Sequence, residues 1–323
     1  MKSSLKYGGY LLSLVFLYLT FRGVDYTSLF LNFPHINVPL LVIALFVNLV
    51  FFSLRALYQE SNLQFIKNDI PFTVSLISIA KAQCYNVFLP ARIGELLRII
   101  FLAEKTGLGK TKLLSYIVIE KFIDFTFFVI LFFIISMIFA DVVENMLLIT
   151  VVAVIFGLFS LYFYIRYNGS IIRVIQYLTP GSLYPRIETL NREIMEGILL
   201  FRSVSQVIRS SIIFLAGWAT IGIIFYLISW PFLGALKLPI YAPVVLMVFS
   251  ALSLAIPSAP SAIGTMHFAF LIAIRLMTHG QYDLELAAGF IVILHFFVIS
   301  FDFIIGGVIL LTYNLRTAHS LQV

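Results

Sequence analysis

The chain has 323 residues, of which 61% are hydrophobic and 11% are charged. Soluble domains carry about 25% charged residues, so this composition excludes a soluble globular enzyme, and its apolar content excludes intrinsic disorder. The net charge of +6 is typical of a membrane protein whose cytoplasmic loops face anionic lipid. A single cysteine, Cys84, excludes an internal disulfide and a cysteine-based metal site. The sequence therefore predicts an all-α polytopic membrane protein.

Six stretches are long and apolar enough to form full membrane spans, since a helix needs roughly 20 apolar residues to cross the bilayer. The first of them follows Lys2 and Lys6 as a signal peptide would, but it has no small-residue cleavage site, so we predict a retained anchor. In chain order the predicted spans are residues 7–22, 37–57, 113–140, 145–166, 210–230 and 285–313.

Two further apolar regions, residues 71–104 and 240–279, are interrupted by proline and glycine. The first breaks at the sequence LPARIG (89–94) and the second at PSAPSAIG (257–264). Proline removes a backbone donor, glycine permits unusual backbone angles, and lipid cannot satisfy the freed polar groups. We predict two re-entrant helical hairpins, or pairs of half-helices. Two ordinary short spans joined by a tight loop are the alternative.

The distribution of lysine and arginine predicts the orientation. With a cytoplasmic N-terminus, most of these residues in the loops face the cytoplasm, and Arg22, Lys237 and Arg275 face outside. Both termini are then cytoplasmic. The first broken region opens to the cytoplasm and the second to the outside.

The two breaks share the pattern P-x-x-I-G, at residues 90–94 and 260–264. Opposite orientation together with a shared pattern is typical of an inverted repeat, which places a binding site near the membrane midplane. A chance match of five residues is the alternative.

Residues 167–209 form the sizeable soluble segment of the predicted topology. Apolar residues recur there at spacings of three and four, which predicts an amphipathic helix at the cytoplasmic interface. A plain connector without a ligand fits the same pattern. The segment is too short to hold a soluble enzyme, so we predict one transmembrane domain over residues 1–323.

Charged residues inside the predicted membrane segments are candidates for function. A charge at the centre of a membrane helix costs about 2.5–3.5 kcal/mol, so such groups pair or line a wet cavity. Several stand three or four positions apart, on one helix face; Lys121 and Asp124 are such a pair. The full set comprises Arg55, Lys81, Arg92, Glu95, Arg98, Glu120, Lys121, Asp124 and Asp302.

The charge left after local pairing is positive and favours an anionic ligand. Broken helices add partial positive charge at their N-termini, and arginine matches phosphate with its bidentate fork. We therefore predict a site for a phosphate-bearing headgroup. A structural ion-pair network that joins the first broken region to the third full span is the alternative.

Two weaker signals do not change this prediction. The segment GLGKT (107–111) lacks the earlier glycine and the preceding strand of a phosphate-binding loop, so we expect no nucleotide there. His267 and His295 lack a metal-ligand spacing and are expected to be polar members of a packed core. The sequence predicts no cofactor and no nucleic-acid partner.

With these residues in view, the chain resembles the transmembrane domain of lysylphosphatidylglycerol synthase/flippase proteins, the flippase-like, YbhN-type membrane family. The resemblance covers nearly the whole chain. The sequence departs from the family where Ser261 and Ala262 replace Gly-Gly, where His267 replaces an acid, and where His295 replaces a frequent arginine. The residues that carry the resemblance are Arg55, Asn86, Pro90, Arg92, Gly94, Glu95, Arg98, the segment EKFID (120–124, close to E-R-x-x-D), Pro257 and residues 260–264.

The resemblance implies lipid translocation: an anionic phospholipid or a lipid-linked saccharide is flipped between the leaflets of the plasma membrane. Members with a cytoplasmic aminoacyltransferase domain also modify phosphatidylglycerol. The chain ends at Val323 without such a domain, so we expect no enzyme activity and a separate synthase or glycosyltransferase as a partner. The residues expected to bind the substrate are Arg55, Lys81, Asn86, Arg92, Glu95, Arg98, Glu120, Asp124, Pro260, Gly264, His267 and His295.

Two other functions remain open from the sequence. One is a membrane-embedded enzyme that acts on a polyprenyl phosphate, with Glu120 or Asp124 as general base. The other is a noncatalytic subunit of a complex that makes lipid or polysaccharide.

Overall fold

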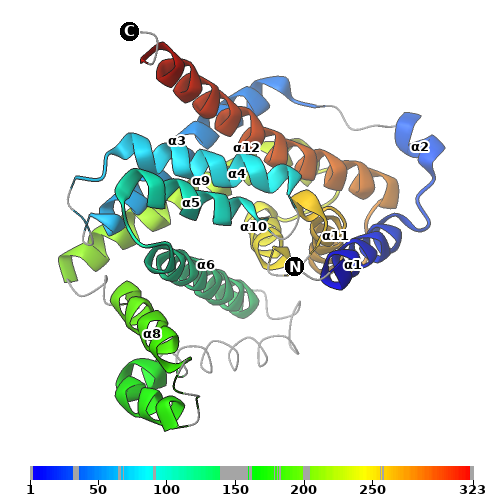
Figure 1. The fold of residues 1–323 in the computed structure, drawn as a ribbon. Helices are drawn as coiled ribbons and strands as arrows, with labels where there is room; N and C mark the ends of the chain where they lie inside the picture. Colours follow the sequence, from blue (N-terminus) through cyan, green and yellow to red (C-terminus); the bar gives the residue numbers. More distant parts are fainter. Residues whose placement is uncertain are drawn as a thin grey trace. The chain divides into compact units, whose positions relative to one another are not determined.

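Every element in the described part of the computed structural model is a helix, which confirms the predicted all-α class (Figure 1). The chain forms two compact units, and each is considered by itself. The larger unit comprises Met1–Phe101 and Ile208–Val323, and the smaller comprises Leu102–Val207. The structure describes residues 3–31, 36–64, 67, 69–89, 92–138, 159, 162–177, 179, 181, 183–198, 204–254, 256 and 258–320.

Ten helical elements belong wholly or mostly to the larger unit, and helices α5 and α9 cross its boundary. They are α1 (Ser3–Phe21), α2 (Tyr26–Leu31), α3 (Val38–Leu63), α4 (Phe72–Phe88), α5 (Gly94–Thr106), α9 (Val204–Leu233), α10 (Ala242–Ser253), the 3₁₀ turn η4 (Pro260–Ala262), α11 (Thr265–Met277) and α12 (Leu284–Ser320). The smaller unit contains α6 (Lys110–Ile138) and α8 (Tyr184–Ile198).

Four segments of the described chain are long and apolar enough to cross a membrane, so the protein is a multi-pass membrane protein. Three of them overlap the predicted spans 37–57, 210–230 and 285–313, and the fourth is Pro260–Met277. The four segments are Val38–Leu63, Ser205–Leu233, Pro260–Met277 and Leu284–Arg316.

The other three predicted spans have different outcomes. The span predicted at 7–22 coincides with α1, whose apolar part Gly9–Phe21 is shorter than the four segments above. The span predicted at 113–140 lies along α6, which is one continuous helix of 29 residues. Most of the span predicted at 145–166 lies outside the described residues. The total of six spans therefore stays a prediction.

Each of the two broken regions consists of two short helices. The first contains α4 with 17 residues and α5 with 13, and the second contains α10 with 12 residues and α11 with 13. Helices α4, α5 and α10 are each shorter than the roughly 20 residues of a full span, whereas α11 together with η4 forms the 18-residue apolar segment Pro260–Met277 named above. The helices end where the sequence predicted the breaks. The depth of the legs in the bilayer stays a prediction, and Pro90, Ala91 and Pro257 lie outside the described residues.

The shared P-x-x-I-G pattern is accompanied by a shared backbone conformation. Its third residue is left-handed in both copies, with φ of 55° at Arg92 and 53° at Ala262. Its final glycine stands where the next helix begins, as the first residue of α5 (Gly94) and as the N-cap of α11 (Gly264). The second copy is also left-handed at Ser261, with φ of 56°. The inverted repeat itself stays a prediction.

Helix α12 is the longest element, with 37 residues, and packs along α4 (Figure 1). Their contact is close because Gly306 has no side chain: a Cβ atom there would lie 3.2 Å from the backbone oxygen of Ala80 and 3.2 Å from Cβ of Cys84. Beside it, Phe51 and Phe52 of α3 are buried against α4. Helices α3, α4 and α12 therefore form a close-packed layer.

In the smaller unit, α8 packs against α6. The ammonium of Lys112 on α6 donates a hydrogen bond to Oε2 of Glu196 on α8 at 2.7 Å. Asn191 of α8 accepts hydrogen bonds from Tyr164 and Asn168 in the helical residues 162–177. A helix thus forms within the predicted connector 167–209, and its place at the membrane interface stays a prediction.

Candidate functional site

A cavity of about 320 Å³ opens inside the larger unit, within the size range of small-ligand pockets. Its apolar wall includes Phe51, Trp218, Phe225 and Met247. Its polar wall is formed by Asn48, Gln83, Asn86, Arg92, Ser250, Ser258, Ser261 and Asp302.

Both helix breaks contribute to this cavity. Leu89 and Arg92 line it from the first break, and Ala259 and Ser261 line it from the second. The hydroxyl of Ser261 donates a hydrogen bond to the carbonyl of Val87 at 2.7 Å, which joins the second break to the end of α4. Two segments that lie far apart in the sequence therefore form one polar site within apolar helices.

Helix α1 also contacts the second break. The backbone N–H of Ala259 donates to the hydroxyl of Ser13 at 2.9 Å. At Gly264 an added Cβ would lie only 2.2 Å from the backbone oxygen of Ser13. The chain after the break therefore follows α1 at a distance that only glycine allows.

Asp302 of α12 is the acidic residue of the cavity wall, and two amides orient its carboxylate. The Nδ2 group of Asn48 donates to Oδ1 at 3.2 Å, and the Nε2 group of Gln83 donates to Oδ2 at 3.1 Å. Oδ1 of Asn48 has no hydrogen-bond partner, although Asn48 is only 2% exposed, and neither polar atom of the Asn86 side chain has one. Buried polar atoms usually have a partner, so these three atoms are unsatisfied groups enclosed in the packed wall beside the cavity.

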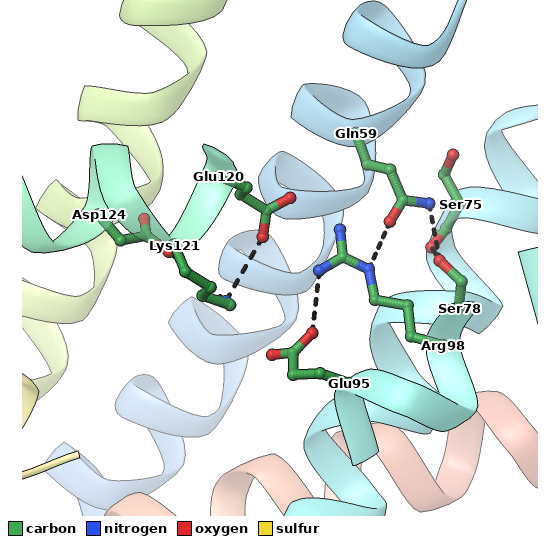
Figure 2. A network of polar contacts seen from close by, with 8 residues as sticks. All are labelled: Gln59, Ser75, Ser78, Glu95, Arg98, Glu120, Lys121 and Asp124. Carbon is green, nitrogen blue, oxygen red and sulfur yellow. Dashed lines mark hydrogen bonds and ion pairs between the residues drawn. The ribbon is translucent and has the colours of Figure 1, made fainter. Parts of the chain in front are cut away.

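Arg98 is held in a buried network and does not line the cavity. Its Nε donates to Oε1 of Gln59 at 2.7 Å, and its Nη1 lies 3.2 Å from Oε2 of Glu95. Gln59 then donates to the hydroxyl of Ser78 at 2.7 Å, which donates to the carbonyl of Ser75 (Figure 2). The network joins α3, α4 and α5, so Arg98 and Glu95 position the helix that follows the first break.

His267 and His295 hold the second break in place. Their ring centroids are 4.2 Å apart, and Nε2 of His295 lies 2.9 Å from the carbonyl oxygen of Ser261. A carbonyl only accepts, so this nitrogen is the donor. Nδ1 of His267 faces the backbone N–H of Gly264 at 3.4 Å and accepts from it. This packing agrees with the polar core expected for both residues.

Arg55 and Lys81 lie over aromatic rings rather than in the cavity. The guanidinium of Arg55 is 5.9 Å from the ring centroid of Tyr58 and 6.0 Å from that of Trp218, which itself lines the cavity. The ammonium of Lys81 lies 4.6 Å from the ring of Phe101. Both geometries are cation–π contacts.

Glu120 and Asp124 lie on α6 in the smaller unit, where they flank Lys121 (Figure 2). The Lys121 ammonium is 3.4 Å from Oε1 of Glu120 and 3.5 Å from Oδ2 of Asp124. The second contact confirms the local pair predicted from their spacing. Glu120 is 1% exposed and Asp124 is 9% exposed.

Of the remaining predicted residues, Pro260 begins η4, between the cavity-lining Ala259 and Ser261. The structure thus brings Asn86, Arg92 and this turn to one cavity. Within the described ranges, no group of three potential metal ligands occurs.

Sequence reasoning did not assign Asn48, Gln83 and Asp302 to the site. Asp302 belonged to the set of membrane charges, and the two amides are isolated polar residues in apolar helices. Polar residues on the faces of apolar helices are the sequence signal that could have found them. The contact between Asn48 and Asp302, which are 254 positions apart in the chain, is visible only in the structure.

A family model described as the lysylphosphatidylglycerol synthase TM region matches residues 7–306, which confirms the resemblance drawn from the motifs. No curated protein matches the chain, and no solved structure matches it.

Proposed function

The chain belongs to the lysylphosphatidylglycerol synthase TM-region family of membrane proteins, and from this premise we propose that it moves an anionic phospholipid or a lipid-linked saccharide between the leaflets of the plasma membrane. The observation that carries the proposal is the polar cavity formed where two helix breaks meet. Polar groups inside apolar helices are costly, so a site of this kind points to a ligand that is polar at one end.

Arg92 is the proposed contact for the phosphate. Among the described residues that line the cavity, it is the only lysine or arginine. Arginine suits phosphate because its planar fork donates two parallel hydrogen bonds. Arg98 is less suited to this role, because Glu95 and Gln59 already engage its guanidinium. The acyl or polyprenyl tail would remain among the lipids while the headgroup occupies the cavity.

The two broken regions would form the path of the lipid headgroup across the membrane. We propose that their short legs are re-entrant from opposite faces of the membrane, with both termini of the chain cytoplasmic. The matching left-handed residues Arg92 and Ala262 support an inverted repeat. In such transporters the substrate binds near the midplane at the repeat interface, and one repeat moves against the other.

We further propose that the chain acts as a transporter and not as an enzyme, because the matched family model is the membrane region alone. Its lipid would then be supplied by a separate synthase or glycosyltransferase. The expected partner reaction is one that builds a polar headgroup on a membrane lipid.

Native mass spectrometry of the purified chain with its copurified lipids tests this function. Arg92→Ala removes the proposed phosphate contact. Lys237→Ala is a matched control, because Lys237 is also a left-handed cation, with φ of 53° against 55° for Arg92, but it is exposed and does not line the cavity. Both substitutions therefore affect the backbone similarly.

We expect a defined anionic or saccharide-bearing lipid on the wild type and on Lys237→Ala, and its loss from Arg92→Ala. Reconstitution of that lipid with the protein in vesicles should then show translocation. The same mixture of bulk lipids on all three proteins would contradict the proposal.

A further inference from the structure

The carboxyl group of Asp302 lies on the apolar segment Leu284–Arg316 and has only neutral hydrogen-bond partners. Its two oxygens accept from the side-chain amides of Asn48 at 3.2 Å and Gln83 at 3.1 Å. Among the described residues, no lysine, arginine or histidine forms an ion pair with it. An isolated carboxylate is costly inside a membrane, and protonation removes that cost. The group is therefore suited to binding a proton.

Arg92 is the charged group that acts on Asp302. Both residues line the cavity and interact electrostatically, but no hydrogen bond or ion pair joins these two described residues. The titratable groups of the helices that pack on α12 lie against other partners. They are Arg55 of α3 (over the rings of Tyr58 and Trp218), Lys81 of α4 (over the ring of Phe101), Cys84 of α4 (against Gly306) and His267 of α11 (against His295).

The charges of the cavity balance only while it is empty. Arg92 and Asp302 are the two charged residues among those that line it, and their charges sum to zero when both are ionised. An anion that binds Arg92 leaves one net negative charge in the site. Arginine keeps its proton in proteins, so the carboxyl group of Asp302 is the member of this pair that can compensate. A proton on one of its oxygens restores neutrality.

We propose that Asp302 is a proton-binding site and that an anionic headgroup and a proton occupy the cavity together, so that lipid transport is coupled to proton movement. The inference rests on the proposed function and adds its coupling ion. The lipid anion and the proton bind as a neutral sum, and they would cross the membrane in the same direction. A pH gradient can then drive the transport without a nucleotide.

The coupling has a defined sign. A proton that binds the occupied cavity better than the empty one strengthens anion binding as the pH falls, because the two binding events are reciprocal. Two like charges about 10 Å apart weaken each other's binding by about tenfold at the effective dielectric of a protein. The affinity for an anionic lipid should therefore be about tenfold higher at low pH than at high pH.

The cavity contains its own reporter for the experiment. Trp218 lines the cavity, and the only other tryptophan, Trp230, is 50% exposed. In the Trp230→Phe background, fluorescence of Trp218 can be followed at pH 5 and pH 8 as short-chain lipids are added to the full chain in detergent. The probes are phosphatidylglycerol, which carries one negative charge at both pH values, and phosphatidylcholine, which carries no net charge.

We expect phosphatidylglycerol to bind about tenfold more tightly at pH 5 than at pH 8, and phosphatidylcholine to show no such dependence. Asp302→Asn imitates the protonated carboxyl group, so it should bind phosphatidylglycerol at both pH values as tightly as the wild type does at pH 5. A merely structural role of Asp302 would instead weaken binding at both. Glu285→Gln is the control, because this acid lies in the first turn of the same helix but not on the cavity, and it should keep the pH dependence.

Asp302→Glu retains a carboxyl group and should retain the pH dependence, so it decides the matter if the amide variant does not fold. An affinity for phosphatidylglycerol that is equal at both pH values in the wild type, or a dependence that survives in Asp302→Asn, would overturn the inference and leave the proposed function standing. Absence of any Trp218 response to either lipid would overturn both.

Discussion

Gly264 meets two requirements at once, a left-handed backbone and close contact with α1. Its φ is 89°, and an added Cβ would lie 2.2 Å from the backbone oxygen of Ser13. Backbone cannot move aside as a flexible side chain can, so an alanine here forces the second break away from α1. Gly280 separates the two effects, since its φ is 78° but nothing lies within 4 Å of an added Cβ.

We predict that Gly264→Ala destabilises the protein by about 1–3 kcal/mol more than Gly280→Ala, the usual range for forced overpacking. Both variants share the strain of a positive φ. Thermal unfolding can be followed with a thiol-reactive dye, because Cys84 is the only cysteine and is buried until the chain unfolds. Equal unfolding temperatures of the two variants would show that the contact with α1 contributes nothing.

At the scale of single residues, sequence reasoning succeeded where the signal was local. The spacing of Lys121 and Asp124 predicted their contact, and the prolines and glycines located both breaks. It did not reveal that Arg98 would be engaged by Gln59, because a pair 39 positions apart leaves no local pattern. Arg98 and Arg92 look alike in the sequence, and only packing separates the network residue from the one on the cavity.

At the scale of elements, the contact between α4 and α12 holds the first broken region against α12, the longest described helix. Gly306 lies at this contact and neighbouring Gly307 does not, since nothing lies within 4 Å of a Cβ added at Gly307. Small residues of this kind let membrane helices approach closely.

We predict that Gly306→Leu lowers the unfolding temperature and Gly307→Leu does not. A leucine at Gly306 would meet Ala80 and Cys84 of α4, and its cost should be of the order of 1–3 kcal/mol or more. Size-exclusion chromatography after heating in detergent measures the loss of folded protein. A larger effect at Gly307 would contradict the packing of the two helices.

The contact of α6 with α8 should depend on pH through Glu196. The hydrogen bond from Lys112 lowers the pKa of this carboxyl below its ordinary value of 4.5. A carboxyl with a lowered pKa stabilises the folded state above its unfolded pKa, and this contribution is lost as pH falls through the lower, folded value. Both side chains are partly exposed, so the pair contributes about 1 kcal/mol at most.

A double-mutant cycle with Lys112→Ala and Glu196→Gln measures this coupling. We expect a coupling energy of up to about 1 kcal/mol at pH 7 and close to zero at pH 3, together with a decrease at high salt. The thermal unfolding of the four proteins at both pH values gives the numbers. A coupling that is equal at both pH values would exclude the ionised carboxyl as its source.

At the scale of the whole molecule, the charge pattern of the sequence and the packing of the larger unit both indicate which segments lie on the same side of the membrane. The sequence predicts that the segment after the first span and the segment before the last span lie on the outer side. The structure packs them together: Val24 and Leu29 are buried against Ala288 of α12, and the backbone N–H of Asp25 donates to Glu285 at 3.4 Å. Segments on opposite sides of a membrane could not make these contacts.

We therefore predict that Thr27 and Gln281 face the outside and that Lys110 faces the cytoplasm, because this orientation would place most lysines and arginines of the loops on the cytoplasmic side. Single cysteines at these exposed positions in a Cys84→Ser background can be labelled with a membrane-impermeant maleimide. In intact cells the first two should react, and the third should react only after the membrane is permeabilised. The opposite pattern would invert the topology, whereas labelling of Thr27→Cys without Gln281→Cys would contradict the packing of α2 on α12.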